Sequence, residues 1–216
     1  MKIAIDGPAG AGKSTIAKLL AQKLGFIYID TGAMYRALTW KALQLGINLD
    51  DSESLTDLAQ STNIYFKNKG DKQYIYCDKE DITELIRTPG INSHVSKLAS
   101  YPTVREIMVK KQQEMAKLAA VVMDGRDIGE CVLPDAQYKF FITASLEERA
   151  KRRILELAEQ GHDLAFMEVK NDIAQRDASD ANRGVGALKI LDDSIIIDTS
   201  DKSIIEVLDT IVSFIN

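Results

Sequence analysis

The sequence has few of the features that mark secreted, membrane-spanning or nucleic-acid-binding proteins. It contains only two cysteines, Cys77 and Cys131, too few for a disulfide framework or a zinc site. Its apolar runs, such as residues 119–123, are far too short to span a bilayer. A basic excess is also missing, because the net charge is −5 and the pI about 5.2. These absences argue against a general nucleic-acid or membrane surface.

Repeats, low-complexity tracts and a signal peptide are not visible either, so we expect a cytoplasmic protein. The 216 residues, of which 45% are hydrophobic and 27% charged, are typical of one soluble globular domain. We expect a monomer with small-molecule ligands.

Short apolar segments alternate with helical patterns along most of the chain. The predicted strands are residues 2–6, 26–30, 120–124, 138–142 and 194–198. The predicted helices are residues 13–24, 33–45, 102–118, 146–160, 163–181 and 203–215. Ser145 with Glu148, and Ser203 with Glu206, have the spacing of capping boxes. This alternation predicts an α/β fold, a doubly wound five-stranded parallel sheet with helices on both faces.

Two segments depart from this alternation. Residues 63–87 predict an antiparallel β-hairpin insertion with a turn at Lys69-Gly70-Asp71. Residues 149–183 are polar, helical and rich in arginine, which makes them a candidate lid. We expect the hairpin and the lid to move when ligands bind.

A phosphate-binding loop joins the first strand to the first helix. Residues 7–14, GPAGAGKS, match the pattern G-x-x-x-x-G-K-[ST]. Backbone N–H groups of such a loop and the helix N-terminus attract phosphate oxygens, and glycines allow a close approach. We expect Lys13, exposed to the phosphate cavity, to reach the β- and γ-phosphates and Ser14 to bind Mg²⁺. The expected ATP-binding residues of this loop are Gly7, Pro8, Ala9, Gly10, Ala11, Gly12, Lys13, Ser14 and Thr15.

A GTPase is the obvious alternative, because Asn68-Lys69-Gly70-Asp71 matches the guanine-reading pattern N-K-x-D. These residues lie in the predicted hairpin turn and not after a later parallel strand. No D-x-x-G switch lies between them and the phosphate loop. A solvated turn explains them better.

Arginines and acids gather after the predicted core strands, where open α/β sheets bind ligands. Arg36 follows the second strand and can bind a phosphate with its planar fork. Asp124-Gly125-Arg126-Asp127 follows the next core strand. In residues 176–183, helical spacing can place Arg176, Asp180 and Arg183 on one face, although a solvated ion-pair helix has the same pattern.

The distribution of arginine supports a site for several phosphates. The chain has nine arginines and eighteen lysines. Arginine is preferred where planar, bidentate phosphate recognition matters. Eight arginines lie at the motifs or in the lid-like segment, at positions 36, 105, 126, 149, 152, 153, 176 and 183.

Five motifs follow one another along the chain: GPAGAGKST, DTGAMYR, the PTVRE of residues 102–106, DGRDIG of 124–129 and RDASDANR. Because these motifs occur in the same order, the chain resembles the bacterial cytidylate kinase family over nearly its whole length. Eukaryotic UMP/CMP kinases share the phosphate loop but are not similar in the other motifs. Thr31 stands where serine is common in the family. The resemblance implies transfer of the γ-phosphoryl group of ATP to CMP or dCMP, with Mg²⁺, in pyrimidine nucleotide metabolism.

The resemblance also implies an organisation and a set of roles. The core would be residues 1–30, 102–148 and 184–216, the monophosphate-binding region 31–101 and the lid 149–183. Arg36, Arg126 and Arg183 would bind the acceptor phosphate, and Arg176 and Asp180 the ribose. Ser96, Arg105 and Asp127 would read the cytosine, whose amino group needs an acceptor such as a carboxylate. Thr31 and Tyr35 complete the implied CMP-binding set.

Catalysis would rest on positioning and charge neutralisation, because the attacking phosphate oxygen is already anionic. We expect the catalytic residues to be Lys13, Arg126, Arg183 and Asp124, the last as a Walker-B-like acid that orients Mg²⁺-bound waters. Arg149, Arg152 and Arg153 are candidate lid residues, some of which are alternatively only solvated, and of the three we expect Arg149 and Arg153 to contact ATP. A different small P-loop kinase, such as a shikimate kinase, and an ATP-gated regulatory module are the alternatives.

Overall fold

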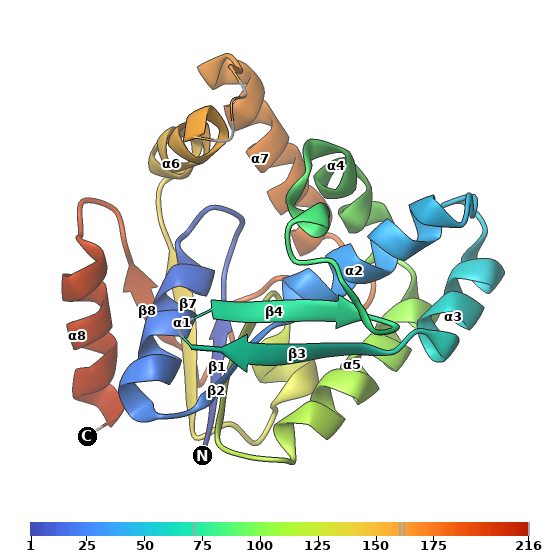
Figure 1. The fold of residues 1–216 in the computed structure, drawn as a ribbon. Coiled ribbons are helices and arrows are strands. Elements are labelled where there is room, and N and C mark those ends of the chain that lie inside the picture. The colour runs from blue at the N-terminus through green and yellow to red at the C-terminus, as the bar shows by residue number, and fades with distance from the viewer. Residues whose placement is uncertain (71, 160, 162, 216) are drawn as a thin grey trace. The chain divides into compact units, whose positions relative to one another are not determined.

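The structure, a computed structural model, describes residues 1–70, 72–159, 161 and 163–215 (Figure 1). The chain packs as two units, Met1–Tyr28 with Leu118–Asn216, and Ile29–Lys117. The second unit includes helix α5 (Pro102–Ala116), which packs against α3 (Ser52–Ser61). The finer division into core, monophosphate-binding region and lid stays a prediction.

The five-stranded parallel sheet is confirmed. Its order is β2-β6-β1-β7-β8, with β1 parallel to both β6 and β7, and β7 parallel to β8. The strands are β1 (Lys2–Asp6), β2 (Ile27–Asp30), β6 (Val121–Gly125), β7 (Tyr138–Thr143) and β8 (Ile195–Asp198). Central strands such as β6 are buried along their whole length, which explains their uninterrupted apolar sequence.

Helices of the first unit pack on this sheet and on one another. They are α1 (Lys13–Leu24), α6 (Leu146–Glu159), α7 (Phe166–Ala181) and α8 (Ile204–Ile215), with a single π-helical turn η2 (Ile128–Val132). Leu20 of α1 and Val207 of α8 lie in the same apolar cluster as Phe140 of β7. A smaller cluster joins α6 to α7 through Leu157 and Ile173.

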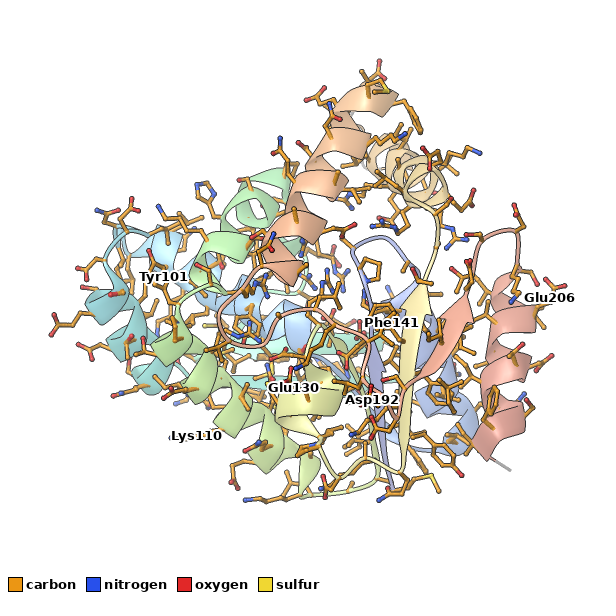
Figure 2. All side chains as sticks on the ribbon, turned by 180° about the vertical axis from the view of Figure 1, so that it is seen from behind. Tyr101, Lys110, Glu130, Phe141, Asp192 and Glu206 are labelled. Atoms are coloured by element: carbon orange, nitrogen blue, oxygen red, sulfur yellow. The ribbon has the colours of Figure 1, made fainter. Side chains whose placement is uncertain are left out.

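Two helix starts show the predicted capping chemistry. In α8 the Glu206 side chain accepts from Ser203 N at 2.8 Å, and Glu206 N donates to Ser203 Oγ at 3.3 Å (Figure 2 labels Glu206). In α6, Glu148 N donates to Ser145 Oγ at 3.2 Å. Satisfying these N–H groups fixes where both helices begin.

The second unit contains the predicted antiparallel insertion. Strand β3 (Ile64–Lys69) pairs with β4 (Lys72–Cys77), and β4 with the short β5 (Glu80–Asp81). Asn68 and Lys69 are part of β3, while Asp71 of the predicted turn lies outside the described residues. The remaining elements are α2 (Thr31–Gln44), α3, η1 (Leu85–Arg87), α4 (Pro89–Leu98) and α5.

Helices α3 and α4 were not predicted. The α3 helix begins after Asp51, whose side chain accepts from the N–H groups of Glu53 and Ser54. The α4 helix begins at Pro89, a residue suited to a first helical turn. None of the described helices has the length and apolar character needed to cross a membrane.

Candidate active site

The residues expected to bind nucleotides fall into two sets, one in each unit. The phosphate loop, Asp124, Arg126, Asp127 and the candidate residues of α6 and α7 belong to the first unit. Thr31, Tyr35, Arg36, Ser96 and Arg105 belong to the second.

The phosphate loop has a backbone that only glycine tolerates at two points. At Gly7, φ is +148° and an added Cβ would lie 1.9 Å from the Ile142 carbonyl oxygen of β7. Gly12, the residue before α1, has φ +87° and makes no side-chain cap. The first N–H groups of α1 therefore need a partner from elsewhere, and a phosphate supplies one. This geometry agrees with the predicted anion-binding loop.

Lys13 is buried, with 5% of its surface exposed, so the expectation of an exposed side chain was wrong. Its Nζ donates to the Pro8 carbonyl oxygen at 2.6 Å, which folds the side chain back over the loop. Burial and then the Arg126 guanidinium hold the pKa of Lys13 well below its ordinary value. Arg176 acts in the same direction, and Asp124 opposes it. A polyanion placed here would relieve this concentration of positive charge.

Ser14, Asp124 and Tyr28 form a hydrogen-bonded group beside the loop. Ser14 Oγ donates to Asp124 Oδ2 at 2.7 Å, and Tyr28 OH donates to Asp124 Oδ1 at 2.8 Å. Asp124 is buried at the end of β6, so its carboxylate is held in place by two hydroxyl groups. A hydroxyl and a carboxylate 2.7 Å apart are suitable oxygen ligands for a hydrated Mg²⁺.

The α6 arginines contact the phosphate loop in different ways. Arg149 is buried and donates from Nη1 to the Ala9 carbonyl oxygen at 3.0 Å and to Asp177 Oδ2 at 2.6 Å. Asp177 in turn accepts from Ala9 N at 3.4 Å, so the ion pair holds both the N–H and the carbonyl group of one loop residue. The structure thus places Arg149 on the protein backbone of the loop, and its predicted contact with ATP stays a prediction.

Arg152 and Arg153 have different surroundings. Arg152 donates to Thr199 Oγ1 at 3.0 Å and to Thr199 O at 2.7 Å, and Thr199 Oγ1 donates to Ala11 O at 3.2 Å. Arg153 pairs with Glu156 one turn along its own helix. Arg152 therefore also supports the loop from outside, whereas the recorded contact of Arg153 is typical of a solvated helix face.

Asp180 joins two of the predicted phosphate-binding arginines. Arg126 Nε lies 2.6 Å from Asp180 Oδ2, and Arg183 pairs with Asp180 Oδ1. Burial opposes ionisation of Asp180, but the charges of Arg126, Arg183 and Arg176 outweigh it and hold its pKa below the usual range. The C-terminal end of α7 and the residues after it are thus brought together with the turn after β6. The solvated-helix alternative is wrong for Asp180, which is 1% exposed.

Asp6, at the end of β1, holds the turn that carries Arg126 and Asp127. Its Oδ1 accepts from Ile128 N and its Oδ2 from Gly129 N, both at 2.8 Å. Burial raises the pKa of Asp6 to about 6, and Asp127 acts in the same direction against the two backbone N–H groups and Lys13.

In the second unit, Asp30 organises the start of α2. It accepts from Ala33 N at 2.7 Å and pairs with Arg36 at 3.0 Å, while Arg87 lies 3.7 Å away. An anionic ligand of Arg36 would meet a guanidinium that is already oriented.

Arg105 and Tyr35, both predicted CMP-binding residues, lie together in this unit. The Arg105 guanidinium carbon is 5.6 Å from the centre of the Tyr35 ring, and Nη1 donates to Ala99 O at 3.1 Å. Thr31 is buried at the first position of α2, and Ser96 is half-buried on α4.

Sequence reasoning missed several residues that position the site. These are Asp6, Tyr28, Asp30, Asp177 and Thr199. Most directly follow or end a strand, and Asp177 adjoins the predicted Arg176. Position at a carboxyl strand end was therefore the available signal.

The parallel sheet and the glycine-rich loop before α1 define a P-loop nucleotide-binding protein. Two solved structures share this fold: an uncharacterized protein from Eubacterium ventriosum, with 16% identity, TM-score 0.56 and coverage of 100% of this chain and 97% of the other, and a Thermus thermophilus protein, with 16% identity, TM-score 0.50 and coverage of 100% and 95%.

Sequence comparison is more specific. The family model for cytidylate kinase matches residues 3–216. A cytidylate kinase of Bacillus cereus is 48% identical over 100% of this chain and 96% of its own length. One from Caldanaerobacter subterraneus is 51% identical over 98% of this chain and 92% of its own. This chain belongs to the cytidylate kinase family.

The buried Asp6 predicts a pH dependence of stability. Below pH 3.8 this carboxyl is neutral in the folded and the unfolded chain. As the pH rises to about 6, the unfolded chain ionises first, so the free energy of unfolding falls. The difference between 3.8 and about 6 corresponds to roughly 3 kcal/mol.

Urea unfolding of the wild-type chain and of Asp6→Asn, from about pH 4 to about pH 8, measures this effect. We expect the wild-type chain to lose stability relative to the variant up to about pH 6 and the difference to stay constant above it. A difference that is independent of pH would show that Asp6 titrates normally.

Proposed function

We propose that this chain transfers the γ-phosphoryl group of ATP to CMP or dCMP and releases ADP with CDP or dCDP. Membership of the cytidylate kinase family supports the choice of acceptor. The observation that carries the proposal is that one unit brings the buried Lys13 of the phosphate loop near Arg126 and Arg176, with Asp180 between Arg126 and Arg183. Such a set of cations suits one donor and one acceptor that both carry phosphate.

The phosphate loop would bind the donor. Residues 7–15 would surround the β- and γ-phosphates with backbone N–H groups, and Lys13 would contact the oxygen atoms that gain charge during transfer. Arg149, whose guanidinium holds the Ala9 carbonyl, supports this role through the loop. Direct contact of Arg149 or Arg153 with ATP belongs to the proposal.

Mg²⁺ is the proposed cofactor, held mainly by phosphate oxygens and waters. Among the described residues no group of three or more His, Cys, Asp or Glu side chains could hold a metal by itself. Ser14 would bind it directly, and Asp124, 2.7 Å from Ser14 Oγ, would orient its waters. When bound, Mg²⁺ neutralises charge on the β- and γ-phosphates.

The acceptor would be recognised by phosphate, ribose and base contacts. Arg36, Arg126 and Arg183 would bind its phosphate, which leaves the attacking oxygen anionic, so that no strong general base is required. Arg176 and Asp180 would bind the ribose.

Base recognition would use Asp127, Arg105 and Ser96, with Thr31 and Tyr35 in support. The cytosine amino group donates to a carboxylate, and N3 and O2 accept from a guanidinium or a hydroxyl group. Uracil has an oxygen in place of the amino group and would leave a carboxylate without a donor. Closure of the α6–α7 segment over the nucleotides also stays a prediction.

A coupled ADP-release assay with Mg²⁺ and ATP tests the acceptor. We expect transfer to CMP and dCMP and much slower transfer to UMP, AMP, dTMP and shikimate. Uracil, thymine and shikimate have no amino group to donate to the carboxylate, and adenine carries its amino group on a larger, two-ring base. Equal rates with AMP and CMP would contradict the base assignment. ATP binding without transfer to any acceptor would support a regulatory module instead.

Lys13→Ala should separate catalysis from stability. Loss of one charged donor to the reacting phosphates should lower kcat about 100- to 1,000-fold. Because burial already disfavours the Lys13 charge, Tm should stay the same or rise. Lys23→Ala, which removes an exposed lysine paired with Asp209, is the matched control and should leave kcat unchanged. Near-normal turnover of Lys13→Ala would exclude the proposed mechanism.

Asp127→Asn tests base recognition. Asparagine keeps the size of the side chain but turns an amide donor toward the cytosine amino group. We expect kcat/KM for CMP to fall about ten- to a hundredfold and to fall less for UMP, which narrows the CMP/UMP ratio. Arg36→Ala should lower both values equally, because phosphate carries no base identity. Equal losses for CMP and UMP in Asp127→Asn would assign Asp127 to the phosphate or Mg²⁺ end of the site.

A further inference from the structure

The turn after β6 leaves the sheet immediately before its functional residues. The pairing of β1 with β6 runs from Lys2 with Val121 to Asp6 with Gly125 and ends there. Asp124 is therefore fixed by the sheet and by its contacts with Ser14 and Tyr28. Arg126 and Asp127 come after the last paired residue, so their backbone must be fixed by something else.

The Asp6 carboxylate supplies that anchor. Its two oxygens accept from Ile128 N and Gly129 N, each at 2.8 Å, so one side chain engages two successive peptides of the turn. These are the first residues of η2, which Figure 2 shows around the labelled Glu130. The residue before η2, Asp127, makes no side-chain cap to it, and the N–H groups are satisfied by β1 instead.

Packing around Gly129 shows how closely the turn is held against β1 and β7. A Cβ on Gly129 would lie 3.1 Å from Lys139 Cδ, 3.2 Å from Leu191 Cδ1 and 3.3 Å from Asp6 Oδ2. A side chain here would crowd these three neighbours and require them or the turn to shift by a few tenths of an ångström. The lack of a side chain at Gly129 and the two hydrogen bonds to Asp6 thus both keep the turn close to β1.

We propose that Asp6 is a positioning residue that fixes Arg126 and Asp127 for acceptor binding by anchoring the two peptides that follow them. This role rests on the proposed function, in which Arg126 binds the acceptor phosphate and Asp127 the base. It needs no contact between Asp6 and a nucleotide. The donor side is held separately, through the phosphate loop and the Ser14–Asp124 pair.

The energetics of Asp6 fit a role in positioning better than one in stability. Burial raises its pKa to about 6, so the ionised form that accepts both N–H groups is disfavoured by its surroundings. An asparagine at this position would have one acceptor oxygen and an amide group whose N–H atoms face a backbone N–H. Asp6→Asn therefore breaks one anchor bond while it removes a buried charge.

Steady-state kinetics of Asp6→Asn, with CMP and ATP varied in turn, test the proposal. One lost bond with a donor facing a donor should raise KM for CMP about ten- to a hundredfold and narrow the CMP/UMP ratio in kcat/KM. KM for ATP should change by less than about threefold, since the donor contacts are held by other residues. The Tm of Asp6→Asn at neutral pH should be no lower than that of the wild-type chain, because the variant removes a buried charge.

Two further variants complete the experiment. Gly129→Ala keeps the Asp6 charge but crowds the same turn against the Asp6 carboxylate, so it should also raise KM for CMP with little effect on KM for ATP. Asp135→Asn is the matched control, because Asp135 is exposed and pairs with Lys2 at the opposite end of β1, and its kinetics should equal those of the wild type. If Asp6→Asn does not fold, KM for CMP and KM for ATP of Gly129→Ala test the proposal in its place.

Three results would overturn the proposal. One is an unchanged KM for CMP in a folded Asp6→Asn or Gly129→Ala variant. Another is a change confined to KM for ATP, which would mean that Asp6 acts through the charge of Lys13. The third is an equal loss in all constants together with lower stability, which would indicate a general structural role. Failure of the proposed function is distinct, because the wild-type chain itself would then not phosphorylate CMP.

Discussion

Burial of the Lys13 side chain, reinforced by the charges of the Arg126 and Arg176 guanidinium groups, is the electrostatic constraint on the phosphate-loop region of the first unit. Holding a buried lysine near two half-buried arginines costs free energy, because water is removed from the ammonium group while like charges approach it. Two carboxylates, those of Asp124 and Asp180, offset part of this positive charge. Asp124 favours the charged form of Lys13, and Asp180 pairs with Arg126 and Arg183. A phosphate-bearing ligand adds the remaining negative charge.

These carboxylates differ in what their surroundings do to them. Burial would keep Asp180 neutral, yet three arginines hold it ionised, so it belongs electrostatically to the cation cluster. Asp6 has fewer favourable neighbours and its pKa rises to about 6. One acid thus orients guanidinium groups while the other orients a backbone turn. The same residue type performs two tasks because local charge, more than burial, differs between the two places.

Much of the fold could be predicted because parallel strands and amphipathic helices leave distinct patterns in the sequence. The GPAGAGKS loop located the phosphate site, since few other structures need that spacing of small residues. Helix α3 was missed because its start depends on the Asp51 side chain and not on apolar periodicity. The role of Arg149 was not predictable either: its guanidinium reaches Ala9, 140 residues earlier in the chain. Contacts of that range depend on tertiary packing, and a local pattern does not record them.

Helix α7 contacts both the phosphate loop and the turn after β6, through residues one helical turn apart. Asp177 engages the Ala9 peptide of the phosphate loop, and Asp180, about one helical turn later, engages Arg126 beyond β6. A rigid helix cannot shift or rotate at one of these residues without doing so at the other. The two contacts therefore fix α7 against both the phosphate loop and the turn after β6. Three residues of spacing on a single helix thus link the phosphate loop to the turn that carries Arg126.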